Sequence, residues 1–172
     1  MGKTIDGIWV DWIEKVKILQ KAVVRREDGL LLAIKRSENQ HSRPGKWDLA
    51  GGSLDEDVVQ TGKDNSGKGD DQDILVKAIK REIREETGLE VKPSSARAIH
   101  TASGYNEQKG HLILAIGYVC EVEARQTVSL SNEHSEFKWV SLQEFNKLDI
   151  GDDGGLILSI LEKVRVCEYT EY

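Results

Sequence analysis

The feature that most constrains this chain is the run Arg81-Glu82-Ile83-Arg84-Glu85-Glu86-Thr87-Gly88-Leu89. Apolar residues recur at helical spacing from Ile74 to Ile83, and Asp73 is suited to capping the start of a helix. Gly88 is suited to the left-handed position that follows a helix. We therefore expect a helix from about Asp73 to Thr87.

On such a helix Glu82, Glu85 and Glu86 stand at i, i+3 and i+4, so their carboxylates share one face. Like charges so placed repel each other, and a bound hard cation with oxygen ligands would offset the repulsion. A run of charges by itself is typical of a solvated helix face. The full nine-residue pattern, however, arises by chance in only about one window in ten million.

The remaining chain mixes strands and helices in one unit, which predicts a single α/β domain over residues 1–172. A hairpin is expected from Ile18–Arg26 and a partner ending at Arg36, joined by the turn at residues 27–29. Apolar runs and caps predict the other elements: strands near residues 90–101, 111–122 and 137–140, a capping box at residues 141–144, and helices after it and over residues 155–164.

Charge and cysteine content exclude several classes of function. The formal net charge is −6, whereas proteins that hold long nucleic acids need clustered Lys and Arg. The two cysteines, Cys120 and Cys167, form neither a disulfide scaffold nor a paired metal motif. The first residues lack the apolar run of a signal peptide or a membrane span. We therefore expect a cytoplasmic protein without a membrane role.

The run from Arg81 to Leu89 resembles the second half of the Nudix hydrolase box, G-x5-E-x7-R-E-U-x-E-E-x-G-U, in which U is aliphatic. The resemblance implies a Nudix-like α/β/α sandwich with a mixed β-sheet. It also implies that Glu82, Glu85 and Glu86 bind Mg²⁺ or Mn²⁺, that Glu82 is a candidate general base, and that Arg81 orients the glutamates.

The first half of the box is interrupted. Counting back from Arg81 places the box glutamate at Asp73, while Trp47–Gly52 matches the family's Trp-x-x-Pro-Gly-Gly turn except at Ala50. Gly52 and Asp73 are 21 positions apart where the box has six, so we infer an inserted polar loop of 15 residues within residues 54–71. A lid over the site and a passive surface loop both remain open. By the same resemblance, the Gly51 carbonyl is a further metal ligand.

Other candidate site residues depend on position relative to these motifs. Glu133, six positions before Trp139, resembles the family's loop carboxylate that faces the metals; the alternative is a solvated loop residue. Tyr105 resembles a tyrosine of the dinucleoside polyphosphate hydrolases, or is a surface or packing aromatic. Arg36 and Trp47 are candidates for substrate contacts, with solvation and packing as their default roles.

The function implied by the resemblance is metal-dependent cleavage of a diphosphate bond in a nucleoside diphosphate linked to another group. The implied substrate is a small nucleotide, such as a nucleoside triphosphate or a dinucleoside polyphosphate. The alternative is a Nudix domain that binds a nucleotide without hydrolysing it, as a sensor or regulatory module. Monomer and homodimer both remain open, and residues 1–17 form an extension without an assigned structure.

Overall fold

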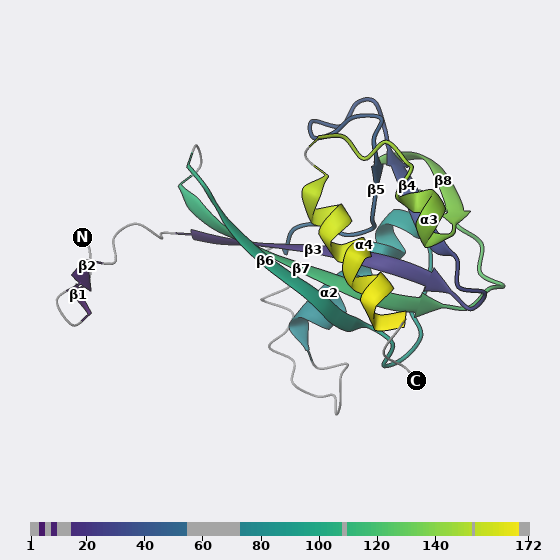
Figure 1. The fold of residues 1–172 in the computed structure, drawn as a ribbon, viewed down its shortest axis with the longest axis horizontal. Coiled ribbons are helices and arrows are strands. Elements are labelled where there is room, and N and C mark those ends of the chain that lie inside the picture. The colour runs from purple at the N-terminus through teal and green to yellow at the C-terminus, as the bar shows by residue number, and fades with distance from the viewer. Residues whose placement is uncertain are drawn as a thin grey trace.

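The computed structural model describes residues 4–5, 8–9, 15–54, 73–107, 110–152 and 154–168 (Figure 1). The expected insertion, except for residue 54, lies outside the described residues, as does most of the extension 1–17. The elements are β1 (Thr4–Ile5), β2 (Ile8–Trp9), β3 (Lys15–Arg26), β4 (Leu31–Arg36), β5 (Trp47–Asp48), α2 (Ile74–Thr87), β6 (Arg97–Asn106), β7 (His111–Val122), β8 (His134–Val140), α3 (Leu142–Phe145) and α4 (Gly155–Glu168).

The central sheet is mixed and has six strands in the order β5-β4-β3-β7-β6, with β8 paired to β4. Strand β3 runs parallel to β7 along its whole length, from Lys15 opposite His111 to Arg26 opposite Val122. The β3–β4 and β6–β7 pairs are antiparallel. The expected hairpin is confirmed by the pairing of Arg25 with Leu31 across a turn in which Gly29 has a φ of 84°.

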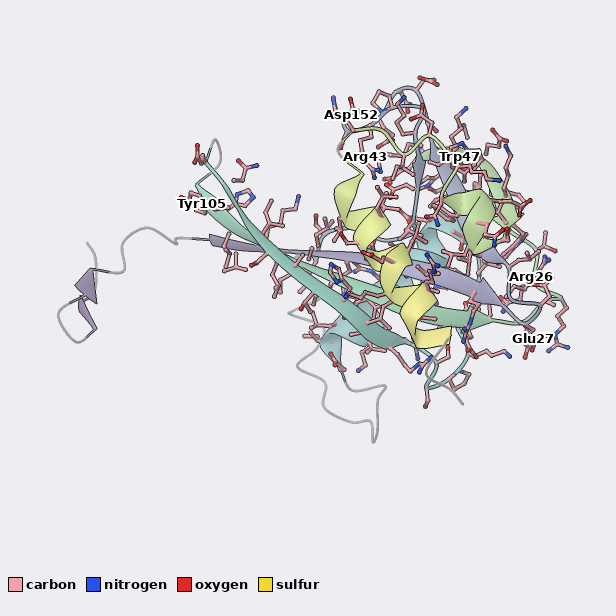
Figure 2. All side chains as sticks on the ribbon, in the orientation of Figure 1. Arg26, Glu27, Arg43, Trp47, Tyr105 and Asp152 are labelled. Carbon is pink, nitrogen blue, oxygen red and sulfur yellow. The ribbon has the colours of Figure 1, made fainter. Side chains whose placement is uncertain are left out.

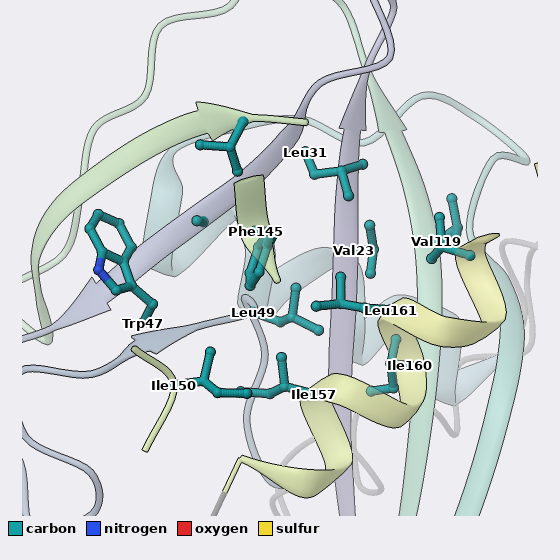
Figure 3. Close-up of a cluster of buried hydrophobic side chains, with 13 residues drawn as sticks. Val23, Leu31, Trp47, Leu49, Val119, Phe145, Ile150, Ile157, Ile160 and Leu161 are labelled. Carbon is teal, nitrogen blue, oxygen red and sulfur yellow. The ribbon is translucent and has the colours of Figure 1, made fainter. Parts of the chain in front are cut away.

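Helices cover both faces of this sheet, which confirms the α/β/α sandwich (Figure 1). Alternating residues of the strands supply the two cores, because successive side chains of a strand point to opposite faces. On β3, Val23 packs in the cluster that contains α4, whereas Ala22 and Val24 pack in the cluster that contains α2. Figure 3 shows the α4 cluster, in which Ile157, Ile160 and Leu161 meet β3 and β7.

Helix α2 begins and ends where its caps predict. The Asp73 side chain accepts a hydrogen bond from the Leu75 backbone N–H at 2.8 Å. Gly88 adopts a φ of 70° and donates its N–H to the Arg84 carbonyl at 2.8 Å. These caps fix the two ends of the helix. Between them, the helical repeat determines which glutamates face the sheet.

Three strands begin at residues that differ from the sequence-based expectation. The strand expected from Glu90 begins at Arg97, because Pro93 lacks a donor for strand pairing and Ser94 turns the chain with a φ of 55°. Strand β3 begins at Lys15 rather than Ile18, because it pairs with the full length of β7. Strand β8 begins at His134 rather than Phe137, through its pairing with β4. No helix in the described ranges has the length and apolar character required to cross a membrane.

Candidate active site

The double glycine after β5 lies between β3 and α2. The Ala50 and Gly52 carbonyls accept backbone hydrogen bonds from Ala22 and Gln20, each at 2.8 Å. Gly51 has a φ of 126°, and a Cβ atom there would collide with the Gln20 carbonyl. A Cβ atom at Gly52 would lie 2.6 Å from a carboxylate oxygen of Glu82. Both glycines are therefore required by close approach, one to a strand and the other to the glutamate helix.

The three glutamates of α2 have different environments. Glu86 is buried and its Oε2 accepts a hydrogen bond from the Gly51 N–H at 2.7 Å. Glu82 is paired with Arg81 Nη2 at 3.1 Å, while the more exposed Glu85 lies 3.7 Å from Arg81 Nε. Arg81 thus contacts two of the three carboxylates. Within the described ranges, no group of three or more Asp, Glu, His or Cys side chains is gathered closely enough to hold a metal ion.

Burial raises the pKa of the Glu86 carboxyl to about 7, because its ionised form loses solvation inside the protein. The nearby Lys21 charge and the hydrogen bond from Gly51 oppose this shift, while Glu82 and Asp48 add to it. An ionised Glu86 is therefore a carboxylate that lacks sufficient positive charge around it. A cation beside it would supply that charge.

A cluster of basic side chains surrounds Asp48, which is fully buried. Its Oδ2 atom lies 3.1 Å from Lys21 Nζ and 3.3 Å from Arg36 Nη1, and it also contacts Arg43 Nη2. Burial by itself would raise the pKa of the Asp48 carboxyl, but the charges of Lys21 and Arg43 outweigh it and hold that pKa below its usual value. Asp48 is therefore an ionised anchor that holds three cations in place.

These groups line one cavity of about 530 Å³. Its wall carries acidic and basic side chains together with the double glycine, while Leu156 and Ile157 of α4 supply apolar surface. The charged lining residues are Lys17, Lys21, Arg36, Arg43, Asp48, Glu82, Glu86 and Glu133. Carboxylates that can hold a cation thus face guanidinium groups that can hold phosphate oxygens.

The loop before β8 brings Glu133 to the same cavity. Its backbone carbonyl accepts a hydrogen bond from the Ser37 N–H at 2.9 Å, which joins this loop to the end of β4. The next residue, His134, is buried and places Nε2 4.0 Å from Glu86 Oε1. Burial, aided by the Lys21 charge, lowers the pKa of His134 to about 4. His134 is therefore a neutral neighbour of Glu86.

Two candidate substrate residues lie elsewhere. Trp47 packs in the core with Phe145 and Ile150 (Figure 3). Lys138 Nζ lies 4.6 Å from the centroid of the Trp47 ring. Tyr105 is 47% exposed on the β6–β7 hairpin, well away from Arg43 (Figure 2). Neither side chain lines the cavity, which supports packing for Trp47 and a surface position for Tyr105.

Four charged cavity residues were missed by the sequence analysis: Lys17, Lys21, Asp48 and Arg43. Lys17 lay in the extension to which no structure was assigned. Lys21 carried a usable signal in the sequence, because it is a charged residue inside the strand segment Leu19–Val24. In the structure it is only 7% exposed. A buried charge must be paired, so its presence predicts a partner. Asp48 carried a weaker signal as a carboxylate beside the glycine turn, and Arg43 lay in a segment interpreted only as polar.

The donor atoms at α2 and the glycine turn fit a hard divalent cation such as Mg²⁺ or Mn²⁺. The Gly51 carbonyl already accepts a hydrogen bond from the Lys21 ammonium at 2.9 Å, so this oxygen points to a place that a cation occupies. Glu86 is buried beside it with insufficient compensating charge. The close approach of Glu82 to Gly52 brings a second carboxylate to the same turn. Glu85 would join Glu82 and Glu86 as a metal ligand only if its contact with Arg81 were broken.

Comparison with known proteins identifies several similar chains. The nucleoside triphosphatase NudI of Salmonella arizonae is 26% identical over 131 residues, which cover 73% of this chain and 82% of that protein. The MutT protein of Methanosarcina mazei Go1 superposes with a TM-score of 0.63 at 26% identity, covering 93% of this chain and 99% of that one. The NUDIX domain of Shewanella oneidensis NrtR, solved with ADP ribose, superposes with a TM-score of 0.59 at 18% identity, covering 88% and 86%.

The NUDIX domain model matches residues 20–158, a range that contains the glycine turn, the glutamate helix and the loop that carries Glu133. The match therefore covers every element that lines the cavity except the start of β3. The chain belongs to the NUDIX domain family and is a hydrolase of the Nudix pyrophosphohydrolase class.

Proposed function

We propose that the chain cleaves the diphosphate bond of a nucleoside triphosphate in a reaction that depends on Mg²⁺ or Mn²⁺. The observation that carries this proposal is one cavity lined by Glu82, Glu86 and Gly51 together with Arg36 and Arg43. A polyphosphate substrate needs both the carboxylates and the arginines. A cation held by the carboxylates offsets part of its charge, and the guanidinium groups offset the rest.

In this proposal Glu82, Glu86 and the Gly51 carbonyl hold the metal, with Glu85 joining them and Arg81 orienting the carboxylates. When bound, the cation offsets diphosphate charge and makes a nearby water more acidic. Glu82 or Glu133 removes a proton from the water, whose oxygen attacks phosphorus as the anhydride P–O bond breaks. The products are a nucleotide and phosphate or diphosphate.

Two observations favour a nucleoside triphosphate over a dinucleoside polyphosphate. The relative NudI is a nucleoside triphosphatase. Tyr105, the residue that favoured a dinucleoside substrate, lies out on the β6–β7 hairpin rather than in the cavity (Figure 2). The substrate assignment therefore rests on the cavity and on this relative.

The test measures phosphate and diphosphate release from the common nucleoside triphosphates and from a dinucleoside tetraphosphate, with Mg²⁺, with Mn²⁺ and with EDTA. We expect metal-dependent release from at least one triphosphate, and a fall in kcat of at least about a hundredfold in Glu82→Gln. Nucleotide binding without any release would contradict hydrolysis and support the sensor alternative. Release that is equal in EDTA would contradict the metal dependence.

A further inference from the structure

Lys21 has an unusual position for a lysine. It projects from the middle of β3 into the protein, and its side chain is only 9% exposed. Its Nζ atom donates to three acceptors: Asp48 Oδ2 at 3.1 Å, the Leu49 carbonyl at 3.0 Å and the Gly51 carbonyl at 2.9 Å. Three acceptors match the three N–H groups of an ammonium ion, so Lys21 is fully satisfied as a buried cation.

Asp48 alone does not account for a third cation. Its carboxylate already contacts the guanidinium groups of Arg36 and Arg43. Two of the three Lys21 hydrogen bonds go instead to backbone carbonyls of the glycine turn. One of these carbonyls belongs to Gly51, whose own backbone N–H donates a hydrogen bond to the Glu86 carboxylate at 2.7 Å. Lys21 thus places a positive charge beside the Gly51 carbonyl, which the proposed function assigns to the metal.

We infer that the Lys21 ammonium is a resident cation of this site that competes with the divalent metal at the Gly51 carbonyl. The inference rests on the proposed metal dependence. A metal bound to an oxygen that also accepts from Nζ at 2.9 Å would lie within a few ångströms of the ammonium, where like charges repel. Lys21 therefore holds the metal-free turn in place and lowers the affinity of the turn for metal.

The same geometry links metal binding to substrate binding. The cavity wall carries four basic side chains (Lys17, Lys21, Arg36 and Arg43) and four acidic ones (Asp48, Glu82, Glu86 and Glu133), so with all of them ionised a divalent cation raises the formal charge of the wall from zero to +2. The phosphates of the substrate supply the missing negative charge. Metal affinity is therefore expected to be low in the free protein and higher when a nucleotide is present, and Lys21 strengthens this coupling.

The test compares Mn²⁺ affinity, measured by calorimetry or by electron paramagnetic resonance without nucleotide, in the wild-type protein and in Lys21→Met. Methionine keeps the unbranched apolar body of lysine without the terminal ammonium, and Asp48 keeps its two arginine partners. We expect Lys21→Met to bind Mn²⁺ at least about tenfold more tightly and to have a lower metal-free melting temperature. Lys92→Met is the matched control, because Lys92 pairs with Glu27 outside the cavity, and its Mn²⁺ affinity should equal that of the wild type.

Unchanged or weaker Mn²⁺ binding in Lys21→Met would overturn the inference, because Lys21 would then be only a structural anchor of the turn. If that variant does not fold, Lys21→Gln replaces it, because glutamine keeps an N–H donor without the charge. We expect the same tighter Mn²⁺ binding and lower metal-free melting temperature from Lys21→Gln. Failure of both to fold would overturn the inference in the same way. A wild-type protein without Mn²⁺ affinity even when a nucleotide is present would instead contradict the proposed function, and the inference would fall with it.

Discussion

Replacement of Glu86 by Gln should stabilise the metal-free protein at pH 8. Burial raises the pKa of Glu86 to about 7 from a usual value of 4.5. A shift of that size corresponds to roughly 3 kcal/mol of unfavourable free energy for the ionised form in the folded state. The residue is only 7% exposed, so solvent screening does not remove this cost. Gln imitates the protonated carboxyl, because its carbonyl oxygen can still accept the Gly51 N–H.

The effect must depend on pH with a defined sign. Below about pH 4.5 the carboxyl is protonated in both the folded and the unfolded chain, so the two proteins should be equally stable. From there to about pH 7 the unfolded wild-type chain releases its proton first, and wild-type stability falls relative to the variant. Above pH 7 the full difference remains. His134, whose pKa is lowered to about 4, contributes the opposite slope, but it is present in both proteins.

The assay is thermal unfolding in EDTA between pH 4.5 and 8.5. A difference of about 3 kcal/mol corresponds to a rise in melting temperature of roughly 6–12 °C for Glu86→Gln at pH 8. Glu85→Gln is the matched control, because its exposed pair with Arg81 contributes at most about 1 kcal/mol. A Glu86 variant no more stable than the wild type at pH 8, or a difference independent of pH, would refute this account of the buried carboxylate.

Three further outcomes are expected. Gly52→Ala should displace Glu82, since the new Cβ would lie 2.6 Å from its carboxylate oxygen; kcat should fall about tenfold or more while circular dichroism stays unchanged. Glu133→Gln should lower kcat more than it raises KM, and constants within about twofold of wild type would show that Glu133 has no catalytic role. Gly117→Ala should lower the free energy of unfolding in urea by about 1–3 kcal/mol, because its Cβ would lie 2.5 Å from Ile160 Cγ1, with kcat unchanged.

Local patterns in the sequence were sufficient for the glutamate helix, whereas the layered fold was implied by the resemblance to the Nudix box. The caps at Asp73 and Gly88 act within a few residues of the helix ends, so they could be recognised along the chain. The alternation of Ala22, Val23 and Val24 between two cores follows from the period of a strand. The Pro93 turn was the local signal that was overlooked, and it displaced the start of β6.

The tertiary structure decided which charged groups meet. Lys21 reaches Asp48 and the Gly51 carbonyl because β3 lies beside the turn that follows β5. The same packing buries Trp47 in the α4 core, and the length of the β6–β7 hairpin carries Tyr105 away from the cavity. Side-chain periodicity specifies which face of an element is buried, but it does not specify the neighbouring element. The order of strands in the sheet, set by long-range pairing, therefore determined the cationic half of the site.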